Sequence, residues 1–151
     1  MKITKSDNEL IELATQVVKS NNDIYDNPAM HVGCVLKAKS GKVYKGVNIK
    51  TSHSICAEQV ALGQALACGE REFDTIVAVK MSADGKCRVV SPCGVCRYVF
   101  EKLDIKLNVI VEDCKTNKVL KVKSEDLLPF PYKRENKKEV RGAKRGKFKL
   151  W

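Results

Sequence analysis

Two short cysteine motifs constrain the fold of this 151-residue chain more than any other feature. "CAE" places Cys56 two residues before Glu58, and "SPCGVCR" places Cys93 and Cys96 three residues apart behind a proline. Each motif falls where the pattern predicts a helix start, and the positive end of a helix dipole favours thiolates. Three thiolates from two helix starts can share one Zn²⁺ only if the fold brings both starts to the same point.

The fourth zinc ligand decides whether such a site is structural or catalytic. His53, three residues before Cys56, offers a fourth ligand that would close a structural site. Glu58 favours the other interpretation, because a structural site does not need it. A carboxylate beside a metal-bound water, in contrast, can accept its proton and pass it on. The motifs therefore predict a catalytic zinc site with one open position.

Hydrophobic periodicity predicts a mixed sheet covered by helices. Apolar residues at helical spacing, after a capping box of Ser6 and Glu9, predict a first helix over residues 6–20. The rest of the pattern predicts strands over 32–38 and 42–48, a buried helix over 55–68, a strand over 75–81, a helix from a Ser91 cap through Pro92 to Leu103, and strands over 107–111 and 119–122. The order αββαβαββ indicates an α/β fold with five strands.

The net charge of +10 is concentrated at the C-terminus. Residues 133–151 carry nine Lys or Arg against two Glu, so +7 lies in this segment and only +3 in residues 1–132. The length predicts one domain over residues 1–132, followed by a basic tail over residues 133–151. A tail this poor in apolar residues is expected to be solvated, and the alternative is an arm that binds nucleic acid.

The remaining cysteines and the start of the chain bear on the compartment. The first dozen residues are charged, and no run of 18 apolar residues occurs, so neither export nor membrane insertion is expected. Seven cysteines, an odd number, favour reduced thiols or metal binding and a cytoplasmic location. His31 is expected to be structural. Four cysteines lack ligand spacing and are expected to be small buried apolar residues: Cys34, Cys68, Cys87 and Cys114.

Four segments together resemble the cytidine deaminase family, and within it the blasticidin-S deaminases: "GVN" at 46–48, "CAE" at 56–58, "SPCGVCR" at 91–97 and "LLPFPY" at 127–132. The resemblance spans residues 5–132 and implies a three-layer α/β/α fold with a mixed five-stranded sheet and helices on both faces. It implies that Cys56, Cys93 and Cys96 hold Zn²⁺ and that Glu58 is the catalytic proton shuttle.

The same resemblance implies how a substrate is held. The backbone of Ala57 would meet the carbonyl of the base, the carbonyl of Ser91 would meet the exocyclic amine, and Asn48 would hold the sugar. Tyr132 takes the place of an aromatic residue that tetramers of this family lend to a neighbouring subunit, which implies a homotetramer. A three-cysteine site is typical of family members that act on free nucleosides.

The resulting expectation is a zinc-dependent hydrolytic deaminase. It would convert a free cytosine nucleoside or nucleoside antibiotic (cytidine, deoxycytidine or blasticidin S) to the uracil form and release ammonia. The alternative is a nucleic-acid-binding protein with a structural zinc site and a basic tail. Nucleic acid as a partner through this tail is the less favoured of the two expectations.

Two positions depart from the pattern of cytidine deaminases proper. Lys50 stands where they usually carry a sugar-binding glutamate, and Gln59 stands where many have an arginine that offsets the thiolate charge. Because lysine only donates hydrogen bonds, Lys50 would favour a substrate whose sugar region is anionic. The alternative is a lysine at a loop tip that points to water. Arg97 is the nearby full positive charge that the sequence offers to the thiolates.

Overall fold

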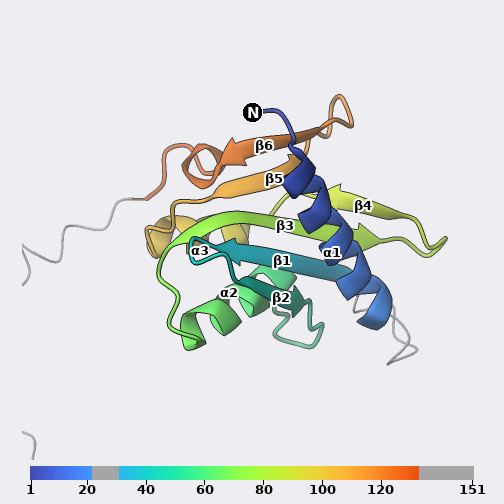
Figure 1. Ribbon diagram of the computed structural model, residues 1–151, viewed down its shortest axis with the longest axis horizontal. Coiled ribbons are helices and arrows are strands. Elements are labelled where there is room, and N and C mark those ends of the chain that lie inside the picture. The colour runs from blue at the N-terminus through green and yellow to red at the C-terminus, as the bar shows by residue number, and fades with distance from the viewer. Residues whose placement is uncertain (22–30, 133–151) are drawn as a thin grey trace, which may run out of the picture.

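A computed structural model describes residues 1–21 and 31–132 of the chain. It consists of one mixed sheet with helices on both faces (Figure 1). The elements in chain order are α1 (Lys5–Asn21), β1 (Val32–Ala38), β2 (Val43–Val47), α2 (Ala57–Ala67), β3 (Phe73–Met81), β4 (Cys87–Val90), α3 (Gly94–Lys102), β5 (Asn108–Glu112), β6 (Val119–Lys123) and the 3₁₀ turn η1 (Ser124–Leu127). The predicted basic tail, residues 133–151, lies outside the described residues.

The sheet has the strand order β2-β1-β3-β5-β6, with β4 paired to β3. β3 and β5 run parallel, whereas the other pairs are antiparallel. One edge of β3 is shared, because β5 pairs with residues 75–77 and β4 with residues 78–81. The expectation of five strands was therefore wrong by one, since β4 is a four-residue strand that the sequence pattern did not show.

Alternating side chains on the strands divide the core into two clusters. Leu36 and Ile76 face the side that α2 and α3 cover, whereas Val35 and Val77 face α1 on the other side. All four are at most 1% exposed. Such period-two burial on both faces is what a central strand between helical layers requires. The predicted three-layer α/β/α fold is thus confirmed, with α1 crossing the front of the sheet in Figure 1.

Two glycines let helices approach the sheet closely. A Cβ atom added at Gly33 would lie 2.6 Å from the carbonyl oxygen of Ala14 in α1. A Cβ atom added at Gly46 would lie 2.2 Å from the carbonyl oxygen of Ala57, the first residue of α2. Real Cβ atoms do not approach other heavy atoms this closely, so any side chain at either position would push its helix away from the sheet. Gly46 therefore sets the height of α2 above β2.

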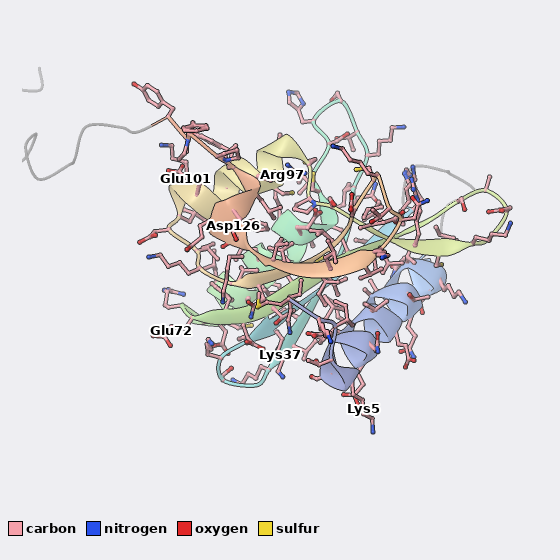
Figure 2. The ribbon with its side chains drawn as sticks, turned by 90° about the horizontal axis from the view of Figure 1, so that it is seen from above. Lys5, Lys37, Glu72, Arg97, Glu101 and Asp126 are labelled. Atoms are coloured by element: carbon pink, nitrogen blue, oxygen red, sulfur yellow. The ribbon has the colours of Figure 1, made fainter. Side chains whose placement is uncertain are left out.

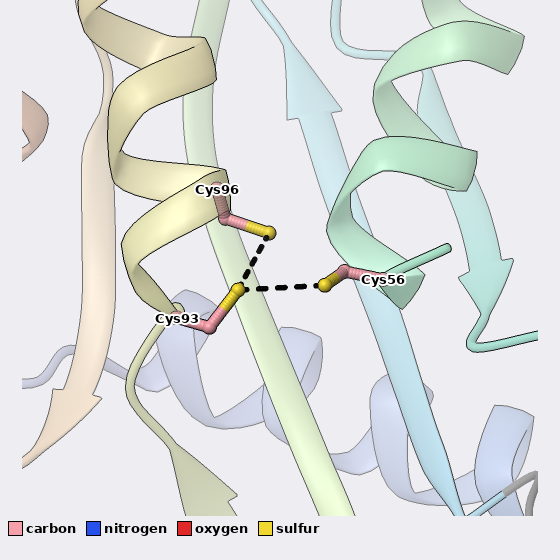
Figure 3. Close-up of side chains that lie close together, drawn as sticks. All are labelled: Cys56, Cys93 and Cys96. Carbon is pink, nitrogen blue, oxygen red and sulfur yellow. Dashed lines mark hydrogen bonds between the residues drawn. The ribbon is translucent and has the colours of Figure 1, made fainter. Parts of the chain in front are cut away.

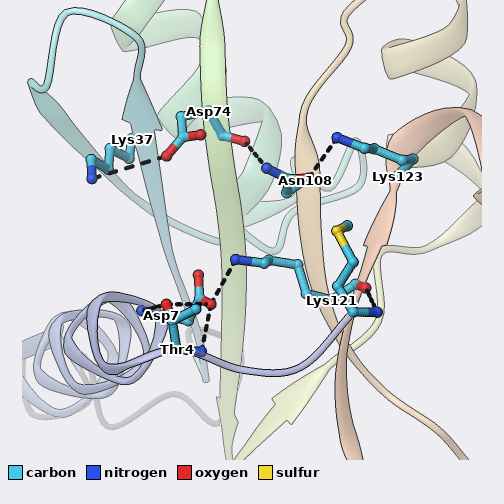
Figure 4. Close-up of polar contacts among 8 residues, drawn as sticks. Thr4, Asp7, Lys37, Asp74, Asn108, Lys121 and Lys123 are labelled. Carbon is cyan, nitrogen blue, oxygen red and sulfur yellow. Dashed lines mark hydrogen bonds and ion pairs between the residues drawn. The ribbon is translucent and has the colours of Figure 1, made fainter.

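The start of α1 differs from its prediction. The capping bonds join Thr4 and Asp7 instead of Ser6 and Glu9. Asp7 Oδ2 accepts a hydrogen bond from the backbone N–H of Thr4 (2.8 Å) and another from its hydroxyl (2.7 Å). Lys121 Nζ in β6 also donates to Asp7 Oδ2 at 2.7 Å (Figure 4). Asp7 is only 3% exposed, and a buried carboxylate is stable when it is paired in this way. The bonds between Thr4 and Asp7 thus cap the start of α1, and the Lys121 contact ties this start to β6.

The prediction that four cysteines are small buried residues holds for some of them only. Cys34 is fully buried in β1 and Cys87 is half-buried, but Cys68 and Cys114 are exposed. Cys68 ends α2 and Cys114 lies in the turn between β5 and β6, and both sites are on the surface. Within the described residues, no helix has the length and apolar character needed to cross a lipid bilayer.

Candidate active site

The N-terminus of α2 places the first cysteine and the glutamate. Cys56 is the N-cap residue, with extended backbone angles (φ −74°, ψ 149°), so α2 begins at Ala57 and not at Ile55 as predicted. Glu58 follows in the first turn and is only 7% exposed. Because α2 packs directly on β2 at Gly46, the cysteine and the glutamate sit at a fixed height above the sheet.

The N-terminus of α3 is built in the same way. Cys93 is its N-cap residue, again extended (φ −67°, ψ 169°), and Cys96 lies in the first turn. The predicted cap at Ser91 was wrong, because its hydroxyl donates to the carbonyl of Glu112 in β5 at 3.1 Å. Helix α3 therefore begins two residues later than expected, at Gly94. As a result, Cys56 and Cys93 hold equivalent places at two helix starts.

The three sulfur atoms converge on one point between α2 and α3 (Figure 3). The Sγ atoms of Cys56 and Cys93 are 3.4 Å apart, those of Cys93 and Cys96 are 3.8 Å apart, and all three lie within 4.8 Å of one another. Two sulfurs bound to a tetrahedral zinc ion at about 2.3 Å lie about 3.8 Å apart. Both the spacing and the thiol chemistry therefore fit Zn²⁺.

The pKa values of two of these thiols are raised, so burial opposes their ionisation. Burial raises the pKa of Cys56 to about 11, with the neighbouring Cys93 thiol and the Glu58 charge acting in the same direction. Burial also raises the pKa of Cys96, aided by the charge of Glu58. At Cys93 the effect of burial is outweighed by the backbone N–H of Cys96 and the neighbouring thiols, so its pKa is lowered. A divalent cation is what would let all three ionise together.

Glu58 lies beside the sulfur cluster at the base of a pocket of about 270 Å³. Burial raises the pKa of its carboxyl, and bonds to its own backbone N–H and the Cys96 thiol offset this only in part. Cys56, Cys93, Ala57, Asn48 and Ser91 also line the pocket. The structure therefore brings together the predicted metal ligands, the predicted proton shuttle and four of the five predicted substrate-binding residues, Lys50 being the fourth.

Three apolar residues of the pocket were not identified as site residues from the sequence: Val32, Ile55 and Val90. Val32 lies at the start of β1 and Val90 at the end of β4, and both line the cavity. Val32 belongs to a strand that the pattern did predict. Which end of that strand would border a site depends on the sheet order, which a single sequence does not display.

The loop between β2 and α2 forms the mouth of the pocket. Lys50 and Ser54 line it, and Lys50 is exposed. His53, the alternative fourth ligand, is exposed, and its Nδ1 lies 3.2 Å from the Ser52 hydroxyl. Among the described residues, the ligand cluster consists of the three cysteines without His53. A zinc ion held by these cysteines would have three protein ligands, the number found at catalytic zinc sites.

Two further predicted residues lie outside the pocket lining. Tyr132 is 77% exposed, and its backbone carbonyl accepts from Lys102 Nζ at 3.3 Å. Arg97 in α3, labelled in Figure 2, donates to the carbonyl of Pro92 (2.8 Å) and to that of Leu127 in η1 (3.3 Å). Its guanidinium is thus anchored to the carbonyl of the residue before Cys93.

Fold and site together fit a zinc-binding enzyme, and the comparisons with known proteins identify its family. Residues 4–112 match the family model described as the cytidine and deoxycytidylate deaminase zinc-binding region. Blasticidin-S deaminase of Bacillus cereus is 34% identical over 139 residues, which are 87% of this chain and 96% of that protein. Cytidine deaminase of Halalkalibacterium halodurans is 41% identical over 75 residues, 48% of this chain and 54% of that protein.

A solved structure agrees with the sequence comparisons. The crystal structure of cytidine deaminase from Burkholderia pseudomallei superposes with a TM-score of 0.65 at 32% identity, and covers 83% of this chain and 98% of that one. The chain belongs to the cytidine and deoxycytidylate deaminase family. The expected family is thereby confirmed, and the alternative of a nucleic-acid-binding protein finds no support in these relatives.

Proposed function

We propose that this protein is a hydrolytic deaminase of free cytosine nucleosides or nucleoside antibiotics, the class that contains cytidine, deoxycytidine and blasticidin S. The observation that carries this proposal is the convergence of three cysteine sulfurs beside a buried glutamate at the base of one pocket. The named activities of the relatives support the choice of substrate class.

In this proposal Cys56, Cys93 and Cys96 hold Zn²⁺. The bound ion would lower the pKa of a water molecule toward neutrality and so supply a nucleophile. The protein contributes the three thiolates at fixed positions on two helix starts and a pocket that encloses the base. Arg97 and the positive ends of the two helix dipoles offset part of the negative charge of the thiolates. This offset is needed for the water to ionise near neutral pH.

Glu58 is proposed to move the protons. Its carboxylate accepts a proton from the attacking water and delivers it to the ring nitrogen beside the amino-bearing carbon. The water oxygen becomes bonded to that carbon, and the second water proton passes through Glu58 to the departing amine. The carbon–nitrogen bond then breaks, ammonia leaves, and the uracil form remains. A buried carboxylate beside both reacting groups suits general acid–base catalysis.

The pocket walls are proposed to orient the base and the sugar. The backbone of Ala57 meets the base carbonyl, the carbonyl of Ser91 meets the exocyclic amine, and Asn48 meets the sugar; all three line the cavity. The Ser91 hydroxyl bond to Glu112 and the bond from Val32 N–H to Asn48 Oδ1 (2.8 Å) hold two of these residues in place. Such bonds restrict the side chains before substrate arrives.

Tyr132 is proposed to act in a homotetramer. It does not line the pocket of its own chain, and Lys102 lies 5.8 Å from its ring centroid, so the ring is held near the outer end of α3. From there it can enter the pocket of a neighbouring subunit. Sedimentation equilibrium of the wild type and a Tyr132→Ala variant tests this, and a fully active monomer would overturn it.

The domain boundary and the compartment are also part of the proposal. We place the whole activity in residues 1–132, and we place the protein in the cytosol, where three thiolate ligands stay reduced. A chain ending at Tyr132 should retain its turnover of free nucleosides. Loss of that turnover would show that the basic segment belongs to the active unit.

The experiment that tests the function is ammonia release by the zinc-loaded protein. Cytidine, deoxycytidine, blasticidin S, cytidine monophosphate and guanine are compared side by side. Turnover of at least one cytosine compound, and none of guanine, is the expected result. Absence of turnover on every cytosine compound would refute the proposal.

A further inference from the structure

The charges of the pocket are arranged by depth. Glu58 is the one carboxylate among its described lining residues, and it lies buried at the base beside the sulfur cluster. Lys50 lines the mouth and is exposed. The part of a nucleoside that remains near the mouth, once its base has reached Glu58, is the sugar and its substituents. A substrate in this pocket therefore places its sugar region beside a cation.

The backbone that carries Lys50 is held in place. Ile49 and Ile55 exchange two backbone hydrogen bonds of 3.0 and 2.9 Å, which close the intervening residues 50–54 into a loop. Inside this loop the Ser54 hydroxyl donates to the carbonyl of Thr51 at 3.1 Å. Lys50 is thus attached at a fixed point, as the first residue of this loop and two residues after Asn48.

The Lys50 ammonium is also available for a ligand. Within residues 1–21 and 31–132, its side chain takes part in no hydrogen bond or ion pair. By contrast, other lysines of this chain are paired, as Lys121 is with Asp7 and Lys86 is with Asp84. An ammonium only donates hydrogen bonds, and its contacts to carboxylate or phosphate oxygens are stronger than those to neutral hydroxyls.

We infer that Lys50 is a substrate-specificity residue that selects cytosine nucleosides carrying an anionic group on the sugar, a carboxylate or a phosphate. This inference rests on the proposed deaminase function and names the substrate class within it. The charge contact holds the ground state and the transition state equally, because it is remote from the reacting carbon. It therefore acts on KM and leaves kcat nearly unchanged.

The test compares three substrates that share the same base and differ at the sugar. They are neutral cytidine, its 5′-carboxylate derivative and cytidine 5′-monophosphate, assayed with the wild type, Lys50→Ala and Lys50→Glu. We expect Lys50→Ala to lose about ten- to a hundredfold in kcat/KM on one or both anionic substrates, through KM, and less than about threefold on cytidine. Lys50→Glu should lose more on the same anion, and the wild-type preference should shrink as salt rises.

The outcomes separate this inference from the proposed function. Lys42→Ala, in the turn between β1 and β2 and away from the pocket, is the matched control and should change none of the ratios. A loss confined to the carboxylate or to the phosphate identifies which anion the pocket takes. Equal effects of Lys50→Ala on all three substrates would overturn the inference while leaving the deaminase in place. No turnover of any of the three by the wild type would refute the inference together with the proposed function.

Discussion

Replacing Gly46 with alanine should damage the active site from a distance. The new Cβ atom would lie 2.2 Å from the carbonyl oxygen of Ala57 and 2.6 Å from the backbone nitrogen of Ala61, both in α2. Ordinary contact begins at 3.4 Å, so α2 and β2 must separate by about 1.2 Å at this point. Because backbone atoms are involved, no side-chain rotation can relieve the overlap.

The shift acts on two quantities. Overpacking of a tight interface costs about 1–3 kcal/mol in the free energy of unfolding. The same movement displaces Cys56 and Glu58, which lie at the N-terminus of α2. Their distances to Cys93 and Cys96 change, because those two residues lie at the N-terminus of α3. A misplacement of about 1 Å in a catalytic arrangement can lower the rate about 10²-fold. Zinc affinity should fall as well, since the thiols no longer surround one point.

Gly33→Ala is the matched control. Its Cβ atom would lie 2.6 Å from the carbonyl oxygen of Ala14, so it pushes α1, which covers the face of the sheet opposite α2. Urea unfolding should show both variants destabilised, whereas kcat at saturating zinc and zinc affinity in a chelator competition should fall mainly in Gly46→Ala. Equal losses of kcat in the two variants would show that the height of α2 above β2 does not set the catalytic geometry.

Two further predictions concern the metal and the buried ion pair. Cys93→Ala should lose bound zinc and thermal stability together, because two thiolates hold zinc poorly, whereas Cys114→Ala, at an exposed turn, should keep both. Burial raises the pKa of Asp7, but its bonds to Lys121 and Thr4 outweigh this and lower it. The pair therefore stabilises the fold above about pH 4, and this contribution is lost as pH falls through the lowered pKa. Wild type and Asp7→Asn should differ by about 3–5 kcal/mol in the free energy of unfolding at pH 7. Urea unfolding should show this difference become smaller toward pH 2, and a difference that does not change with pH would contradict this.

The three-cysteine cluster could be predicted because its signal is local. The spacing of Cys93 and Cys96 and the position of Cys56 before Glu58 each fix a geometry within one helix turn. The strands β1 and β3 were likewise visible, because seven or more consecutive residues with few charges give a strong pattern. Local patterns of this length survive folding with little change.

The errors arose where distant contacts decide the outcome. β4 has four residues including the exposed Arg88, and it becomes a strand by pairing with residues 78–81 of β3. Asp7 in the first turn of α1 is paired with Lys121, and the Ser91 hydroxyl before α3 is bonded to the carbonyl of Glu112. These partners lie 114 and 21 residues away in the chain, so a pattern of neighbouring residues does not contain them.

The central claim is that Glu58 moves protons at an open zinc site and is not a ligand. The most direct measurement is the rate of ammonia release by Glu58→Gln with zinc content determined on the same sample, beside Glu125→Gln at an exposed position of η1 as the control. Glutamine keeps the size of the side chain but removes its ability to carry a proton. We expect undiminished zinc and a rate at least about 10²-fold below that of the wild type. A zinc-loaded Glu58→Gln protein with a near-wild-type rate would contradict the account.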